Sequence, residues 1–274
     1  MNNVYKRIFT GILLASGIIG CITLGAYGLL FLTLTINLLG LQEFYGLFRS
    51  ETLLPRFLTG ILLGSLLILS CFLFAEGFTD HRVFIILIPF TFAIFAMELF
   101  LKAENPFLNI AITLVGVLAI SAPLSLFLLL AFLSPASSIY HPEIILGVFF
   151  LLWSVDCGAY FWGKWVGKRP LFTRISPHKT WEGSLGGAIC GFSTAYLISL
   201  WYRSYSLKEW MIITGIILVT GTLGDLIKSL MKRSLHIKDS GTLLPGHGGI
   251  LDRFDTLLGS AAFIYGFLVL KGNA

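Results

Sequence analysis

The chain has 274 residues, of which 56% are hydrophobic and 12% are charged, and its mean hydropathy is +0.88. Water-soluble domains carry about 25% charged residues, and a soluble fold of this length has too little interior for so much apolar surface. The composition therefore excludes a soluble enzyme, a disordered chain and a disulfide scaffold. The net charge of +5 is spread between apolar segments, so nucleic acid is not expected as a partner.

Apolar segments follow one another along the chain, most of them long enough to cross a hydrocarbon core about 30 Å thick. They occupy residues 8–48, 57–75, 83–101, 107–133, 143–162, 183–202, 209–227 and 256–270. The first is too long for one helix and is expected to break around Gly20–Gly25. We therefore predict an all-α integral membrane protein with about nine transmembrane helices.

Lysine and arginine indicate the orientation, because they are enriched in cytoplasmic loops. With the N-terminus in the cytoplasm, 15 of the 19 basic residues fall on the cytoplasmic side and 4 on the other. We predict one polytopic membrane domain over 1–274, with mainly hydrophobic scaffold spans in 1–142 and a catalytic half in 143–274. Polar residues gather in loops at about 163–182 and 228–255, so the site is expected at the cytoplasmic interface.

Asp156 lies in the apolar segment 143–162. A carboxylate in an apolar helix costs about 2.5–3.5 kcal/mol on insertion scales, and it normally faces a bundle interior, a cavity or an ion. The alternative is a position close enough to the interface for hydration.

The stretch from Ser176 to Ser184 reads SPHKTWEGS. Thr180 can cap the helix that follows, and a helix N-terminus beside Lys179 is suited to bind an anion. The alternative is an ordinary capped helix start with an interfacial lysine.

Asp225 and Lys228 are three residues apart at the end of the segment 209–227, and Lys232 follows one turn later. This spacing puts them on one helical face, where the carboxylate could bind an ion and the lysines phosphates. The alternative is a salt bridge between neighbouring turns.

The densest polar segment runs from Lys238 to Asp255 and contains four glycines and a proline, which favour a shaped backbone over a helix. Asp252 and Asp255 stand three apart at the start of the last apolar segment. Together with Asp225 they would repel one another unless a cation intervened. Carboxylate oxygens suit Mg²⁺, and hard-cation ligands among many basic residues indicate phosphate chemistry. The alternative is a solvated loop.

These residues resemble a known family. The pattern S-x-x-K-R-x4-K-D-x-G-x2-L-P-G-H-G-G-x-L-D-R-x-D, which spans residues 229–255, is similar to the signature of the phosphatidate cytidylyltransferases (CDP-diglyceride synthases). S-P-x-K-T-W-E-G at 176–183, G-D at 224–225 and D-x-x-A-Y at 156–160 also resemble that family. The N-terminal half agrees only in hydropathy and span count. His178 is a small departure, since many relatives carry a basic residue there.

The resemblance implies a nucleotidyltransferase of phospholipid biosynthesis that condenses CTP with phosphatidic acid, giving CDP-diacylglycerol and pyrophosphate. It also implies a requirement for Mg²⁺, a second monovalent cation (K⁺) and a homodimer. The enzyme would lie in a bacterial inner (plasma) membrane, with its active site facing the cytoplasm, where CTP arrives from water and phosphatidate from the leaflet.

Site residues follow from motif position and from chemistry. The metal ligands implied by the resemblance are Asp225 and Asp252, and Asp156 is expected to support that ion or a second one. The catalytic group is predicted to comprise Lys238, Asp239, His247, Arg253 and Asp255. Substrate binding is predicted for Ser176, Lys179, Lys228, Lys232, Arg233, Gly246, Gly248 and Gly249.

Three other functions fit parts of the pattern. A CTP-dependent kinase of a membrane alcohol would release CDP in place of pyrophosphate. A transporter or channel could use Asp156 and Asp225 along an ion path, although the polar residues concentrate on one predicted side. A structural scaffold would leave the segment 238–255 without a purpose.

Overall fold

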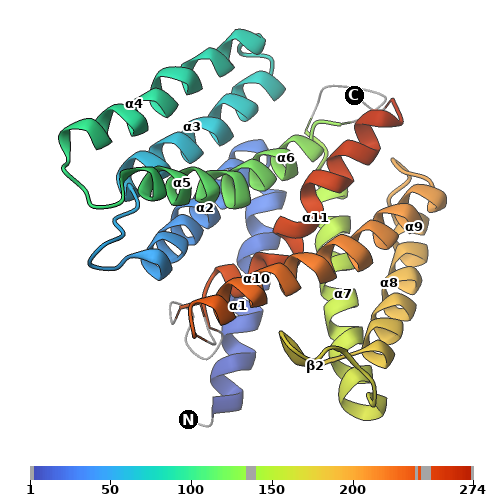
Figure 1. Cartoon of the computed structure of the whole chain (residues 1–274). Helices are drawn as coiled ribbons and strands as arrows, with labels where there is room; N and C mark the ends of the chain where they lie inside the picture. The colour runs from blue at the N-terminus through green and yellow to red at the C-terminus, as the bar shows by residue number, and fades with distance from the viewer. Residues whose placement is uncertain (1–2, 134–139, 238–239, 242–247, 273–274) are drawn as a thin grey trace. The chain divides into compact units, whose positions relative to one another are not determined.

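A computed structural model describes residues 3–133, 140–237, 240–241 and 248–272 (Figure 1). In this part of the chain, eight helical segments are long and apolar enough to cross a membrane, and a shorter apolar helix, Phe9–Thr23, precedes them. The predicted all-α membrane class is confirmed. The first two helices separate at Gly25, inside the predicted break, and its φ of +98° is one that glycine adopts at little cost.

The chain divides into two compact units. The first unit comprises Met1–Phe132, Ala136–Tyr140 and Asp239–Phe254. The second unit comprises Leu133–Pro135, His141–Lys238 and Asp255–Ala274. The predicted division into a scaffold half and a catalytic half stays a prediction.

The first unit consists mainly of helices joined by short connections. They are α1 (Asn3–Thr23), α2 (Ala26–Phe48), α3 (Phe57–Ala75), a 3₁₀ turn (His81–Ile86), α4 (Leu87–Phe100), α5 (Pro106–Gly116), a π-helical turn (Val117–Ser121) and α6 (Ala122–Leu130). Buried polar side chains cross-link them: Asn37 donates to Ser65 at 3.3 Å and accepts from Ser121 at 2.6 Å. Interhelical hydrogen bonds of this kind hold helices together in lipid.

An ion pair joins α3 to α4 inside the first unit. The Arg56 guanidinium donates to both carboxylate oxygens of Glu98, with Nη2 to Oε2 at 2.9 Å. The two side chains are 15% and 3% exposed. The Arg56 backbone N–H also donates to Thr113 Oγ1 at 2.8 Å, so the start of α3 is held by both α4 and α5.

The second unit contains helices and a small hairpin. Its elements are α7 (Pro142–Val166), β1 (Pro170–Phe172), β2 (Ser176–Thr180), α8 (Trp181–Trp201), α9 (Leu207–Ile216), a π-helical turn (Ile217–Gly221), α10 (Thr222–Ser234) and all but the first turn of α11 (Leu251–Leu270). The strands pair antiparallel, with Pro170 opposite Thr180 and Phe172 opposite Ser176. The hairpin thus occupies part of the segment expected as a loop.

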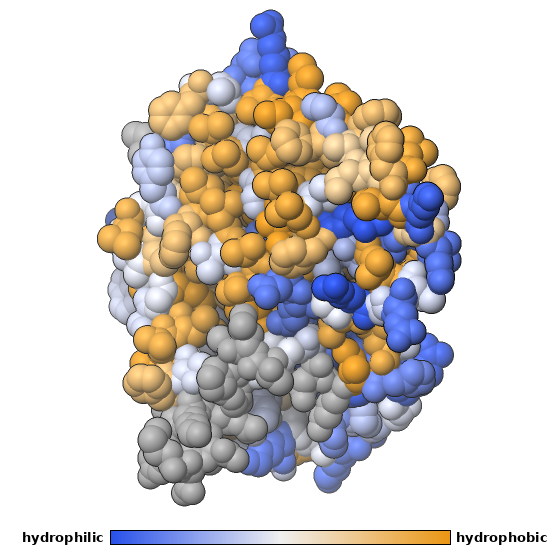
Figure 2. All heavy atoms as spheres, turned by 90° about the vertical axis from the view of Figure 1, so that its left-hand side faces the viewer, coloured by the Kyte–Doolittle hydropathy of each residue, from blue (hydrophilic) through white to orange (hydrophobic). Residues whose placement is uncertain are grey.

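Large apolar side chains cover much of the exposed surface, as Figure 2 shows for one face. On α4, Leu99 and Phe100 are 82% and 83% exposed. In water such a surface would be a strong aggregation liability, whereas lipid tails satisfy it. The surface therefore agrees with the apolar helix lengths in indicating a membrane protein.

Replacing Glu98 with alanine should destabilise the first unit, because the Arg56 charge would be left buried without its partner, at a cost of about 3–5 kcal/mol. Thermal unfolding in detergent, followed by tryptophan fluorescence, should show a clear fall in Tm. Asp80→Asn is the matched control, since Asp80 pairs with Arg82 at a surface where both side chains are more than half exposed. Equal Tm values for the two variants would contradict the assignment.

Candidate active site

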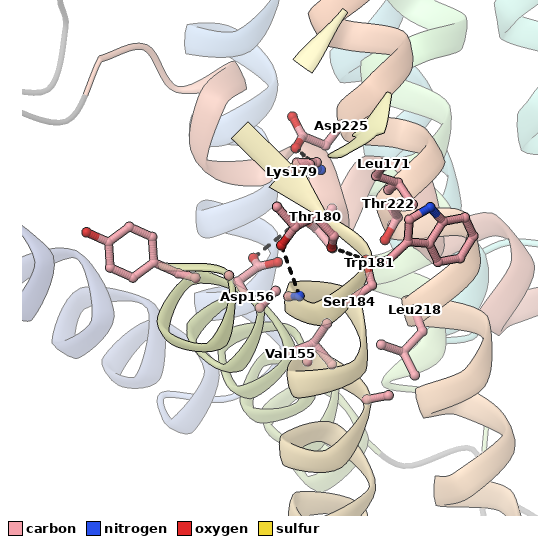
Figure 3. A pocket seen from close by; sticks show the side chains of 18 of the residues that line it. Val155, Asp156, Leu171, Lys179, Thr180, Trp181, Ser184, Leu218, Thr222 and Asp225 are labelled. Carbon is pink, nitrogen blue, oxygen red and sulfur yellow. Dashed lines mark hydrogen bonds and ion pairs between the residues drawn. The ribbon is translucent and has the colours of Figure 1, made fainter. Parts of the chain in front are cut away.

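The second unit contains a cavity of about 1050 Å³. Its walls come from α7, the hairpin, α8, the π-helical turn, the start of α10 and Thr256 of α11 (Figure 3). Asp156, Lys179 and Asp225, which were predicted as site residues from the sequence, line it together with the predicted cap Thr180. The tertiary structure therefore brings together motifs that lie about 20 to 70 residues apart in the sequence.

Small residues bring α7 and α8 close together beneath this cavity. A Cβ atom at Gly158 would lie 2.8 Å from the Gly186 carbonyl oxygen, and one at Gly187 would lie 2.9 Å from that of Val155. Glycine at these positions removes the side chains that would separate the helices. The part of α7 that carries Asp156 therefore packs directly against the N-terminal half of α8.

Lys179 lies on strand β2 of the hairpin and lines the same cavity. Thr180 caps α8 by accepting a hydrogen bond from the Gly183 backbone N–H at 3.1 Å, which confirms the predicted cap. The Glu182 carboxylate accepts from the backbone N–H groups of Lys168 and Arg169, at 3.1 Å each. These contacts hold both ends of the hairpin against the first turn of α8.

Two lysine–aspartate pairs form the charged part of the site. Lys179 of β2 and Asp225 of α10 point toward each other and form an ion pair (Figure 3). Their side chains are 32% and 26% exposed. Lys228 of α10 contacts Asp255 of α11, with Nζ 3.4 Å from Oδ2, and this pair is more buried, at 10% and 16%. Each lysine therefore contacts an aspartate on a different element.

Asp156 and Asp255 are linked through Thr256. The Thr256 hydroxyl lies 3.4 Å from Asp156 Oδ2 and 3.4 Å from Asp255 Oδ1, and the Thr256 backbone N–H donates to that second oxygen at 2.9 Å. Asp225 belongs to the same region, since a Cβ atom at the preceding Gly224 would lie 3.2 Å from the Asp255 carbonyl oxygen. Three carboxylates from three helices thus share one region with two lysines.

A glycine crossing sets the spacing between α10 and α11. A Cβ atom at Gly224 would lie 2.9 Å from the Gly259 Cα, and one at Gly221 would lie 2.5 Å from the Thr256 side chain. Because Asp225 directly follows Gly224, and Asp255 lies one turn before Gly259, this contact brings the two carboxylates together. A π-helical turn precedes Gly224, and such turns are common at functional sites.

The carboxylate donors are chemically suited to Mg²⁺. Asp225 and Asp255 offer carboxylate oxygens from neighbouring helices, and oxygen ligands of this kind suit this hard cation. Among the described residues, no group of three His, Cys, Asp or Glu side chains is arranged to hold a metal ion by itself. Mg²⁺ in proteins usually takes one or two carboxylates and completes its shell with water and substrate phosphates.

Part of the cavity wall is apolar. Leu185 and Val219 line it and are 63% and 61% exposed, and Leu223 is 52% exposed. Trp181, at the start of α8, is 58% exposed in the same wall. One cavity therefore joins a charged surface to an apolar surface that is accessible from outside the unit.

Other predicted site residues lie elsewhere or outside the described residues. Ser176 begins β2, and Arg233 donates to the Ile237 carbonyl oxygen at 3.1 Å near the end of α10, where Lys232 also lies. Gly248, Gly249, Asp252 and Arg253 belong to the first unit. Lys238, Asp239, Gly246 and His247 lie outside the described residues. The pairing of Asp225 with Asp252 at one metal ion stays a prediction.

Thr256, Thr222 and the apolar wall were not among the residues predicted from the sequence. Thr256 carries a signal in hindsight, because it directly follows Asp255 in the signature segment. Thr222 and the apolar residues carry none, since a threonine or leucine in a membrane span is ordinary. Their part in the site depends on which faces of the helices meet.

Comparison with known proteins identifies the family of this chain. A family model described as the cytidylyltransferase family matches residues 5–271. The chain belongs to the cytidylyltransferase family. A phosphatidate cytidylyltransferase of Bacillus subtilis (strain 168) is 34% identical over 279 residues, which cover 98% of this chain and 99% of the relative. Family membership thus extends into the N-terminal half, which the motifs did not reach.

Two staphylococcal relatives match a shorter region. A phosphatidate cytidylyltransferase of Staphylococcus haemolyticus is 45% identical over 116 residues, covering 42% of this chain and 44% of the relative. That of Staphylococcus saprophyticus is 46% identical over 116 residues, with the same coverage. All of these relatives are bacterial.

Replacing Gly224 with alanine should push α10 away from α11, because the new methyl group would lie 2.9 Å from the Gly259 Cα. Overpacking of this kind costs about 1–3 kcal/mol, so Tm in detergent should fall. Gly215→Ala is the matched control in the same candidate span, since its Cβ would meet nothing within 4 Å. A Gly224→Ala variant as stable as Gly215→Ala would contradict the glycine crossing.

Proposed function

We propose that this chain is a phosphatidate cytidylyltransferase, which condenses CTP with phosphatidic acid and releases CDP-diacylglycerol and pyrophosphate. The observation that supports this most directly is the cavity of the second unit, where Lys179 and Asp225 face an opening with an apolar wall. One substrate is a water-soluble polyanion and the other is a lipid with a phosphate head, so a single site must offer both surfaces.

The reaction needs no nucleophile from the protein. A phosphate oxygen of phosphatidic acid attacks the α-phosphorus of CTP and forms the new P–O bond. The bond between that phosphorus and the oxygen bridging to the β-phosphate breaks, and its electron pair leaves with pyrophosphate. Catalysis of such a transfer is mainly a matter of positioning the reactants and neutralising their charge.

The lysines of the cluster supply positive charge for this purpose. Lys179 is one-third exposed and reaches into the cavity, so it can contact a substrate phosphate while Asp225 orients it. Lys228 is more buried and holds Asp255 in place. Lys232, Arg233 and Arg253 are proposed to contact further phosphates of CTP or the lipid, because their charge suits that task.

Mg²⁺ is the proposed cofactor, held by Asp225 with Asp255 and Asp156 nearby, and by Asp252 as the resemblance implies. When bound, the metal ion neutralises phosphate oxygens and steadies the leaving pyrophosphate. Asp225 would then serve both the metal ion and Lys179. A second, monovalent cation such as K⁺ and a homodimer are proposed on the resemblance alone.

The apolar wall of the cavity is proposed to receive the lipid. Leu185, Val219 and Leu223 expose apolar surface next to the charged cluster. A diacylglycerol backbone could enter along this wall with its phosphate leading toward Lys179. The distribution of lysine and arginine supports a cytoplasmic active site, and the bacterial relatives support a bacterial plasma membrane.

Purified protein in detergent should release pyrophosphate only when CTP, phosphatidic acid and Mg²⁺ are all present. EDTA should stop the release, and excess Mg²⁺ should restore it, because the carboxylate cluster needs a divalent cation to bind two polyanions together. Analysis of the nucleotide product separates this activity from that of a membrane-alcohol kinase, which would yield CDP. Turnover that is unaffected by EDTA would contradict the metal assignment.

Replacing Asp225 with asparagine should lower kcat by about 10²-fold or more, because the variant loses the charge that orients Lys179 and attracts the cation. Asparagine has nearly the same shape, so Tm in detergent should change little. Asp80→Asn, at an exposed position in the first unit, should retain wild-type turnover. Near-normal pyrophosphate release by Asp225→Asn would remove Asp225 from the site.

A further inference from the structure

Glu43 of α2 is a carboxylate that the sequence motifs do not include. Its Oε2 accepts a hydrogen bond from the Ile250 backbone N–H at 2.6 Å. Its Oε1 is buried and has no hydrogen-bond partner among the described residues. The two partners lie 207 residues apart in the chain and belong to the same unit. Burying a carboxylate costs free energy, so a functional role would account for Glu43 at this position.

Two glycines of the signature segment make room for this carboxylate. A Cβ atom at Gly249 would lie 2.0 Å from Glu43 Oε1, and one at Gly241 would lie 3.1 Å from Oε2. The backbone therefore passes against Glu43 at two places in the segment. Any larger residue at Gly249 would displace either the carboxylate or the segment.

The same part of the segment holds Asp252. The backbone N–H and the hydroxyl of Ser240 donate to Asp252 Oδ2, at 3.1 and 2.9 Å. Ser240 directly precedes Gly241, and Ile250 directly precedes the first residue of α11. Glu43 thus contacts both stretches of backbone that flank the Ser240–Asp252 interaction.

We propose that Glu43 is a positioning residue for the cytidylyl transfer, acting through the backbone of Gly249 and Ile250 to orient Asp252 at the start of α11. The charge of Glu43 strengthens its hydrogen bond to Ile250, since hydrogen bonds to ionised acceptors are shorter and stronger than neutral ones. This role rests on the proposed function. Through Glu43, helix α2 of the first unit would help to orient Asp252 of the signature segment.

The main test compares Glu43→Ala with Glu43→Gln in the pyrophosphate assay. Alanine removes the acceptor, and kcat/KM should fall about 10- to 100-fold, the usual effect of losing a hydrogen bond to a charged group. Glutamine keeps an acceptor for the Ile250 N–H, so kcat/KM should stay within about threefold of wild type. Glu51→Ala, at an exposed position of the same unit, is the control and should be unchanged. The proposal is wrong if Glu43→Ala stays within twofold, or if Glu43→Gln falls as far as Glu43→Ala.

Two further measurements keep the test decisive if alanine impairs folding or if the wild-type protein is inactive. Gly249→Ala should lower kcat/KM alone but add little to Glu43→Ala, because removing the carboxylate opens the space that the new methyl group needs. Additive effects would overturn the proposal. Amide hydrogen exchange at Ile250 should rise at least tenfold in Glu43→Ala and not in Glu43→Gln. If the wild-type protein releases no pyrophosphate, the proposed function fails, whereas the exchange result still decides the role of Glu43.

Discussion

The compensation of buried carboxylates by lysines from other elements is the interaction on which the site depends. Asp225 and Asp255 lie on neighbouring helices of the second unit, and each contacts a lysine, Lys179 or Lys228. Without these partners the aspartates would carry a large desolvation cost in an apolar bundle. Asp156 adds a third carboxyl group beside these two lysine–aspartate pairs, through its contact with Thr256.

Small residues make this cluster possible by allowing helix backbones to approach one another. The contact between Gly224 and Gly259 places Asp225 beside Asp255, and the glycines between α7 and α8 let the part of α7 that carries Asp156 pack closely against α8. Lipid gives no hydrophobic drive for helices to associate, so close packing and polar contacts must hold them together. The same glycines that stabilise the bundle therefore also set the spacing of the charged groups.

A residue of α2 in the first unit contacts the backbone of the signature segment. Family similarity extends over residues 5–271, although the recognisable motifs lie in the C-terminal half. Within the first unit, Glu43 contacts the backbone of the segment that contains Asp252. The N-terminal helices thus provide a polar contact to this segment as well as apolar surface.

The sequence by itself determined the membrane class, the approximate number of spans, the break near Gly25 and the family, because apolar length, charge and motif spacing are local properties of the chain. Only the tertiary structure decided which charges meet. Lys228 lies three residues from Asp225 yet contacts Asp255, and Glu43 meets Ile250 across 207 residues. Helices in lipid are apolar on nearly every side, so their sequences do not show which faces will pack. Those pairings arise from helix crossings, and the crossings depend on where small residues coincide in space.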